Sequence, residues 1–270
     1  MKTLSSLVVS RMRSSLLLAA ALFGLAAMPW SANAAGAESD SLRVGISYVE
    51  PPFVAGSKDR TPEAIDTALA QELAKKLGLS AQLVKAQTVD ADKARVVLAA
   101  QKSDAKDDTG SVVAIPTGYL LAPMAIMRTD TDIKSWEQLK DRTVCVAEGG
   151  SYVGSLAQRY GAKEMVYPAP TDALLALRTG QCDAAVHDEF LLQALLKLPE
   201  WKKFSAKLTY KGEKQPLVFL AAADDTVALD AIRQLTKEWK AKDRLAELTK
   251  SRANNMAFEV YLDQEVPDCH

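Results

Sequence analysis

The amino-acid sequence predicts an α/β protein of two lobes, each a mostly parallel sheet flanked by helices, with a cleft between them. Short apolar strands alternate with amphipathic helices through most of the 270 residues, a pattern typical of parallel sheets covered by helices. The chain is long enough to build two hydrophobic cores. A cleft between two such lobes is a common place for a small-molecule site.

Two apolar stretches predict that the chain crosses twice between the lobes. Residues 115–128 are apolar but interrupted by proline and glycine, and residues 214–223 are well placed to lead back. We therefore expect two crossover hinge strands. The expected division is a discontinuous lobe 1 of residues 35–122 and 216–270, and a lobe 2 of residues 123–215.

The first 34 residues have the features of a secretory signal peptide. Basic residues precede an apolar run over residues 16–28, and Ala32-Asn33-Ala34 supplies a small-x-small cleavage pattern. The run is short for a membrane span, which needs ~20 apolar residues. We expect export with cleavage after Ala34, and an uncleaved membrane anchor is the alternative.

Lobe 1 is expected to begin with a strand at residues 42–46 and a helix at residues 62–77. Thr61 is a suitable N-cap for this helix, and Pro62 suits its first turn. Apolar residues recur every four positions along it and predict one buried stripe: Ile65, Leu69, Leu73 and Leu77. The other elements expected in lobe 1 are strands at 81–84 and 218–222 and helices at 90–102 and 227–239.

Lobe 2 shows the same alternation of strands and helices. The elements expected there are helices at 136–139, 152–160, 171–179 and 189–198, and strands at 143–147, around 166, and at 183–186. The turn at 148–151 joins a strand to a helix. Ligands of α/β proteins are commonly held just beyond the carboxyl ends of such strands.

The order of these motifs resembles solute-binding protein family 3, the periplasmic receptors of polar amino-acid ABC importers. The resemblance covers residues 41–250 and rests on motifs in the family's order: Leu42 to Gly45 followed by Pro51-Pro52-Phe53, Ala64-Ile65-Asp66 through Leu77-Gly78-Leu79, Ile133 to Lys140, Val144 to Ser151, and Cys182 to Asp188. It implies a type II periplasmic binding protein-like fold and a periplasmic location. It also implies a monomer that binds a small molecule without a cofactor or catalysis and delivers it to an inner-membrane ABC permease.

The resemblance places two groups of ligand-binding residues in lobe 2. Asp188 follows a buried strand and would accept hydrogen bonds from a ligand ammonium; its alternative role is to cap the following helix. Gly149, Gly150 and Ser151 precede a helix, whose N–H groups and dipole would attract an anionic group of the ligand. An ordinary turn without a ligand is the alternative for these three residues.

Three further residues are expected at the cleft from the lobe 1 side. Phe53 is expected to line the cleft, with packing in the core as the alternative. Tyr119 lies in the first crossover and either stacks on the ligand or packs at the hinge. Glu50 stands where the family commonly carries an aromatic residue, and it faces either the cleft or solvent.

One departure from the family bears on the ligand. The family's ligand-clamping arginine is missing from the shortened segment 105–110, where Lys106 cannot form a bidentate pair with a carboxylate. A lost cation and an added acid argue against an ordinary α-amino acid. They permit a ligand that is cationic or carries an amine.

The three cysteines predict one disulfide in an exported chain. Cys145 and Cys182 are expected on strands of the same lobe, and a bond requires their Cα atoms to lie within ~7 Å. Two buried thiols are the alternative. Cys269 is left over, either as a thiol or paired between chains.

Charge and motif content narrow the function classes. No run of basic residues indicates nucleic-acid binding, and no metal-ligand spacing is present with only His187 and His270 as imidazoles. The first alternative to a transport receptor is an enzyme similar to cyclohexadienyl dehydratase, which would need a cleft carboxylate such as Glu50 or Glu148. The second is an accessory or sensor protein that keeps the fold without serving transport.

Overall fold

The computed structural model describes residues 41–51, 56, 58–62, 64–90, 92–101 and 110–264. The expected signal peptide, Phe53, Lys106 and Cys269 lie outside the described residues. All the described residues belong to one unit of the chain, residues 39–270. Among them, no helix combines the length and the hydrophobicity needed to cross a bilayer.

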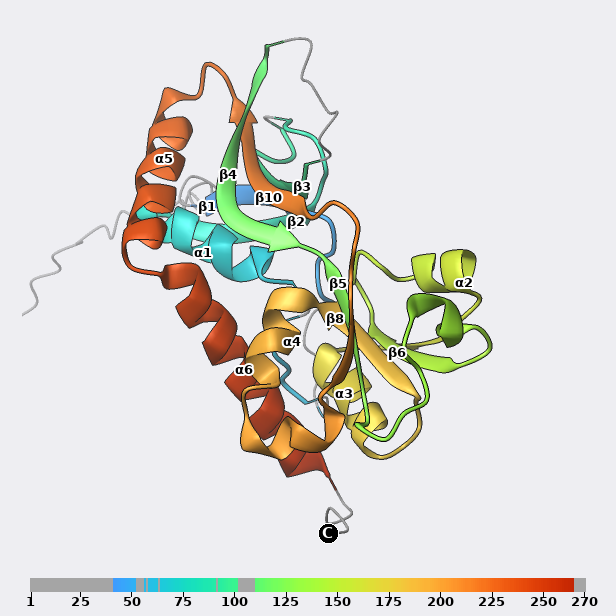
Figure 1. The fold of residues 1–270 in the computed structure, drawn as a ribbon. Helices are drawn as coiled ribbons and strands as arrows, with labels where there is room; N and C mark the ends of the chain where they lie inside the picture. The colour runs from blue at the N-terminus through green and yellow to red at the C-terminus, as the bar shows by residue number, and fades with distance from the viewer. Residues whose placement is uncertain are drawn as a thin grey trace, which may run out of the picture. The chain divides into compact units, whose positions relative to one another are not determined.

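Two five-stranded sheets form the framework (Figure 1). Sheet 1 has the order β2-β1-β3-β10-β4, with β1 (Ser41–Ile46), β2 (Ser80–Lys85), β3 (Val96–Ala100), β4 (Val112–Leu121) and β10 (Gln215–Ala222). Sheet 2 has the order β7-β6-β8-β5-β9, with β5 (Pro123–Met127), β6 (Thr143–Ala147), β7 (Lys163–Tyr167), β8 (Ala184–Asp188) and β9 (Ala206–Thr209). The expected α/β fold with two sheets is therefore confirmed.

The sheets are mixed, which corrects the expectation of mostly parallel sheets. In sheet 1, β1 pairs in parallel with β2 and β3, whereas β10 is antiparallel to both β3 and β4. In sheet 2, β6 is parallel to β7 and β8, whereas β5 is antiparallel to β8 and β9. The crossover from β4 leads directly into β5, so β5 enters its sheet without the helical connection that makes neighbouring strands parallel.

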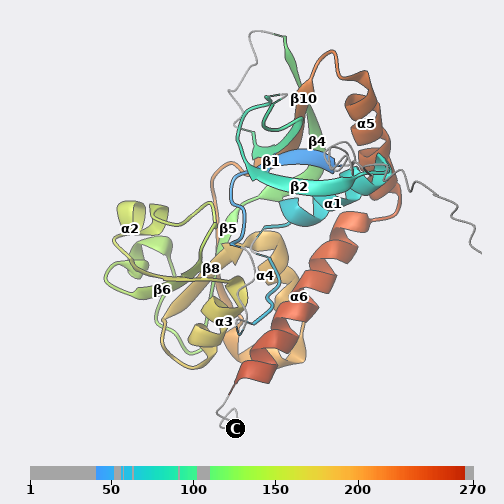
Figure 2. The same ribbon diagram turned by 180° about the vertical axis from the view of Figure 1, so that it is seen from behind.

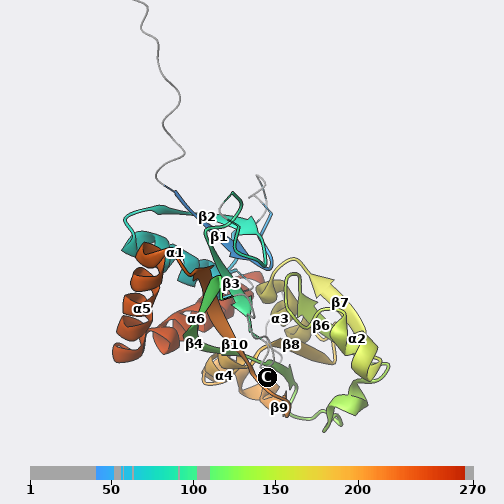
Figure 3. The same cartoon turned by 90° about the horizontal axis from the view of Figure 1, so that it is seen from above.

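One face of sheet 1 packs against α1 (Asp66–Lys76) and α5 (Thr226–Ala241), which lie on the same side of the sheet in Figures 1 and 3. Alternate residues of the strands point to this face because side chains alternate along a strand. The buried strand residues of this core include Leu42, Val44, Ile46, Val96, Leu98, Phe219 and Ala221.

Two expectations for lobe 1 are wrong. The helix expected from Pro62 begins only at Asp66, and Thr61 caps nothing there but hydrogen-bonds to Glu259 instead. The helix expected at 90–102 is replaced by a turn at Asp90–Ala94 and by strand β3. The apolar run of β3 is continuous, and its pairing with β1 and β10 on both sides makes it an interior strand.

Helices cover both faces of sheet 2. The helices of one face are α3 (Pro170–Arg178), α4 (Glu189–Leu195), the 3₁₀ helix η2 (Pro199–Phe204) and the second half of α6 (Arg244–Asp263). On the other face are the 3₁₀ helix η1 (Trp136–Leu139) and α2 (Ser155–Tyr160). The expected helices of lobe 2 are therefore present, although α2 begins three residues later than expected.

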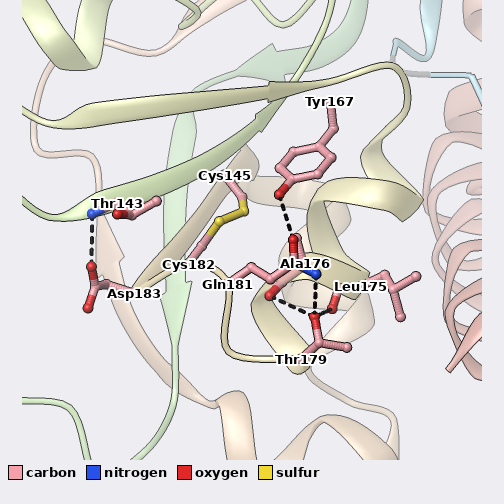
Figure 4. Close-up of a disulfide and its surroundings, with 9 residues drawn as sticks. All are labelled: Thr143, Cys145, Tyr167, Leu175, Ala176, Thr179, Gln181, Cys182 and Asp183. Carbon is pink, nitrogen blue, oxygen red and sulfur yellow. Dashed lines mark hydrogen bonds between the residues drawn. A yellow bond between two sulfur atoms is a disulfide. The ribbon is translucent and has the colours of Figure 1, made fainter. Parts of the chain in front are cut away.

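Cys145 and Cys182 form a disulfide beneath this sheet, as the sequence predicts (Figure 4). Cys145 lies in β6 and Cys182 lies two residues before β8, and their Cα atoms are 5.9 Å apart. Next to the bond, the Asp183 carboxylate accepts a hydrogen bond from the Thr143 amide at 2.8 Å. The disulfide and this hydrogen bond both join β6 to the residues that lead into β8.

Helix α6 was not expected, and it packs against both cores. Leu245 and Leu248 contact the core of sheet 1, whereas Met256 and Val260 are buried in the core of sheet 2. Figure 2 shows the helix running from beneath α5 to a place beside α3 and α4. Residues 216–270 were expected to belong to lobe 1, but within α6 only the first half packs on the core of sheet 1. The division of the lobes at residues 122 and 215 stays a prediction.

Glu259 of α6 joins the segment before α1 to the helices of sheet 2. One carboxylate oxygen accepts hydrogen bonds from the amide and the hydroxyl of Thr61, at 3.1 and 2.6 Å. The other oxygen accepts a hydrogen bond from the hydroxyl of Thr171 in α3. Arg252 adds a second connection by donating to the carbonyl oxygens of Pro62 and Ala64. These contacts hold the chain in the place from which α1 begins.

Replacing Glu259 with alanine should lower the free energy of unfolding by about 2–3 kcal/mol, because hydrogen bonds to charged groups are strong and two buried hydroxyls lose their acceptor. Urea denaturation followed by circular dichroism measures the change. Glu247→Ala on the same helix is the matched control, because Glu247 is exposed and pairs only with Arg244 in the contacts described; its loss should stay below ~0.5 kcal/mol. Equal losses in the two variants would contradict the prediction.

Candidate functional site

A cavity of about 930 Å³ is lined by residues of both sheets. From the sheet 1 side its polar lining includes Ser47, which follows β1, and Asp66, the first residue of α1. From the sheet 2 side it includes the turn Gly149–Ser151 and the end of β8 at His187 and Asp188. Of the residues expected at the cleft, the two lobe 2 groups, Gly149–Ser151 and Asp188, line this cavity together.

Asp188 carries a carboxylate that its surroundings satisfy only in part. The hydroxyl of Tyr119 donates a hydrogen bond to Oδ2, whereas Oδ1 is buried without a hydrogen-bond partner in the described part of the chain. Asp188 stands at the N-cap of α4 without a side-chain capping bond of standard geometry, although the nearby amide of Phe190 favours its ionised form. Burial raises the pKa of Asp188, and the hydrogen bond from Tyr119 opposes that shift. A ligand N–H group at Oδ1 would supply the missing donor.

His187 is a buried neighbour of this carboxylate and also lines the cavity. Its Nδ1 accepts a hydrogen bond from the Asp188 amide, so the neutral ring carries its proton on Nε2. The ring lies 6.3 Å from that of Tyr152, measured between centroids. His187 is therefore a packed imidazole in the wall of the cavity.

The turn Gly149–Ser151 lines the cavity without the helix N-terminus that the sequence predicted behind it. Helix α2 begins at Ser155, and the amides of Gly154 and Ala157 donate to the carboxylate of Glu164, at 2.6 and 2.8 Å. The amide of Gly150 donates to the carbonyl of Ala147. The start of α2 is therefore already capped by a negative charge, and the proposed attraction of the helix dipole for a ligand anion is wrong.

Gly149 is the point where the loop after β1 meets this turn. Its φ is +87°, a conformation that residues with a side chain rarely adopt. A Cβ atom built on Gly149 would lie 2.4 Å from Cδ1 of Tyr48. Glycine thus allows the ring of Tyr48, from the sheet 1 side, to rest directly against the backbone of the sheet 2 side.

Replacing Gly149 with alanine should destabilise the protein more than the same change at Gly180. Gly180 has a φ of +78° and open space around it, so Gly180→Ala measures the backbone penalty alone, about 1–2 kcal/mol. Gly149→Ala adds the collision with Tyr48, about 1–3 kcal/mol more. Thermal unfolding of both variants checks this, and adding Tyr48→Ala to Gly149→Ala should recover the excess. Equal effects of the two alanine variants would refute the contact.

The remaining predicted residues differ in their placement. Tyr119 is buried, its ring lies 5.2 Å from that of Phe190, and its hydroxyl donates to Asp188. Glu50 is exposed and is not among the residues that line the cavity. The same holds for Glu148, and Phe53 lies outside the described residues.

Two features of the cavity were missed from the sequence. Asp66 is buried at the start of α1, where Oδ1 accepts a hydrogen bond from the Thr67 amide at 2.8 Å; its sequence signal was its place in Ala64-Ile65-Asp66, at the beginning of the helix that resembles the family's first helix. The second feature is an extensive apolar lining from β3, β4 and β10. Across the described residues, no group of three or more histidine, cysteine, aspartate or glutamate side chains is arranged to hold a metal ion.

No model of a known protein family matches the chain, and no curated protein matches it. Solved structures do resemble it. An ancestral cationic amino acid solute binding protein has a TM-score of 0.54 at 21% identity, covering 78% of this chain and 95% of its own. An amino acid ABC transporter substrate-binding protein from Streptococcus pneumoniae, bound to L-arginine, has a TM-score of 0.53 at 16% identity, covering 80% and 96%. At these identities the likeness establishes the two-lobed solute-binding protein fold.

Proposed function

We propose that this chain is a periplasmic solute-binding protein that captures a small polar metabolite, an amino acid or an amine, for an ABC importer. The observation that carries the proposal is the buried Oδ1 of Asp188, which lacks a hydrogen-bond partner within the described residues and belongs to a cavity lined from both sheets. A ligand ammonium there would form a charge-assisted hydrogen bond. Closure of two lobes around a ligand is a known motion of such folds.

The names of the structural neighbours support the same class of ligand. One is described as binding cationic amino acids and another was solved with L-arginine. In this chain Asp66 and Asp188 both contribute carboxylates to the cavity lining, which suits a ligand with a positive charge. Export through the signal peptide, cleavage after Ala34, a monomeric state and docking to an inner-membrane permease complete the proposal.

A second candidate is an enzyme on the same fold, similar to cyclohexadienyl dehydratase. The observation that favours it is the raised pKa of Asp188, because a cleft carboxylic acid that holds its proton can serve as a general acid. Asp188 replaces Glu50 and Glu148 in this hypothesis, since both glutamates are exposed and outside the cavity lining. Turnover of a candidate metabolite that disappears in Asp188→Asn would favour the enzyme.

The proposal is tested by thermal unfolding of the exported protein, purified from the periplasm, against a broad panel of amino acids and amines. A ligand present at 100 times its dissociation constant should stabilise the fold by ~2.7 kcal/mol. Mass spectrometry of the same preparation should show a chain that begins at Ala35. If no compound of the panel raises the unfolding temperature, the binding proposal is wrong and an accessory role without a ligand is favoured.

A further inference from the structure

The face of sheet 1 opposite α1 and α5 is apolar, and it lines the cavity. The pairing of β10 with β3 and β4 places side chains in rows across the three strands. One row contains Val97, Leu220 and Ala114, and the next contains Ala99, Val218 and Pro116. All six side chains point away from the core formed with α1 and α5, because residues two apart along a strand share a face.

This face has no helical cover in the part of the chain that the structure describes. The residues of α1 and α5 pack with the alternate strand positions, such as Phe219 and Ala221. Ala99, Ala114, Val218 and Leu220 line the cavity, together with Val112. Most of these five are only half-buried, although sheets with crossover helices are usually covered on both faces. The apolar surface therefore continues from the polar end of the cavity along the sheet.

The apolar wall extends along β4. Val112 and Pro116 are four positions apart on β4, and this separation corresponds to ~13 Å along a strand. The crossover into β5 follows β4, and β5 pairs with Asp188 through Pro123. Following β4 into β5, the row that contains Pro116 comes closer to the pairing of Pro123 with Asp188. Val112 marks the far end of the apolar wall.

We propose that the ligand is an amphipathic amine, with its cationic head at Asp188 and a hydrocarbon or aromatic body against Ala99, Ala114, Val218 and Leu220. This inference rests on the proposed binding function and narrows it from polar solutes to amines with an apolar body. A small polar amino acid would leave the apolar wall in contact with water. An apolar ligand body as long as the wall removes the apolar surfaces of both the ligand and the wall from water. This burial is the main source of affinity in largely apolar sites.

A series of linear amines from n-butylamine to n-octylamine tests the inference by isothermal titration calorimetry on the purified exported protein. Each added methylene should tighten binding about fourfold, because burial of one methylene stabilises by an amount that corresponds to this factor. n-Octanoate should bind far more weakly than n-octylamine, since its head is anionic. L-Arginine serves as the polar comparator.

Leu220→Gln tests the wall while leaving Asp188 intact. The amide of the introduced glutamine should weaken the binding of n-octylamine about tenfold. It should change the binding of n-butylamine by less than about twofold, because only the longer chain reaches it. Leu120→Gln is the matched control, because Leu120 is exposed on β4 and is not among the lining residues. Ala114→Leu is a second variant that narrows the cavity and keeps the wall apolar, so it should also weaken the long chain selectively.

The outcomes separate this inference from the proposed function. Affinity that rises with chain length and falls in Leu220→Gln or Ala114→Leu supports it. Binding of polar amino acids, with no dependence on chain length and no effect of the wall variants, overturns it and leaves the binding function standing. Failure of every amine and amino acid to bind refutes both.

Discussion

Replacing Asp188 with asparagine should weaken binding of an amine ligand by about 30-fold or more, because loss of one partner from a buried charged hydrogen bond costs at least ~2 kcal/mol. Asparagine keeps the shape of the side chain and can still accept the hydrogen bond from Tyr119. What it lacks is the charge that attracts an ammonium. Calorimetric titration with the tightest amine of the panel measures the change.

The same substitution should raise the stability of the protein without ligand. Burial raises the pKa of Asp188, so the folded state binds a proton more tightly than the unfolded state. The stability contributed by this group is fully present below the ordinary aspartate pKa of ~3.9 and is lost as pH rises through the folded pKa. Above the folded pKa the ionised carboxylate therefore destabilises the fold, and asparagine removes that cost.

Urea denaturation between pH 4 and pH 8 checks this second expectation. The wild type should lose stability relative to Asp188→Asn as pH rises over that interval. Asp230→Asn is the control, since Asp230 is exposed on α5 and pairs with Arg233. Unchanged ligand affinity in Asp188→Asn would remove Asp188 from the site, whatever the stability shows.

Removing the disulfide should lower the free energy of unfolding by ~3–4 kcal/mol in the double variant Cys145→Ala/Cys182→Ala. The bond closes a loop with a sequence separation of 37 residues, and a loop of this length restricts the unfolded chain by about this amount. Cys145 is fully buried, so lost packing adds to the effect. Urea unfolding in the absence of reductant gives the comparison.

Two controls isolate the covalent bond. Addition of a reductant should destabilise the wild type and leave the double variant unchanged. Cys269→Ala measures the effect of losing a thiol elsewhere in the chain. A loss below ~1 kcal/mol in the double variant would show that the second sheet does not depend on this bond for its stability.

The sequence was informative where the decisive pattern is local. Alternation of short apolar runs with helical stripes predicted most strands and helices, including β1, β6 and α5, because burial of one face leaves a periodic trace. The stretch 115–128, with its prolines, predicted the passage from β4 to β5. Asp188 was placed at a strand end for the same reason, and the structure finds it there beside a cavity.

The disulfide shows how far such local inference reaches. Cys145 and Cys182 were each predicted in strand-like segments of one lobe, and adjacent strands bring Cα atoms within bonding range. The structure pairs β6 with β8 in parallel and places the two Cα atoms 5.9 Å apart. Two local predictions and one rule about neighbouring strands were sufficient here.

Other features depended on which distant residues cover a segment, and the sequence by itself did not determine them. The apolar run of β3 is compatible with a helix until β1 and β10 are known to lie on both sides of it. The start of α2 was a candidate anion site until Glu164 of β7 was found to cap it. Local sequence patterns indicate that a side chain is buried or that the end of a helix needs a hydrogen-bond partner. Only the tertiary structure decides which residue meets that need.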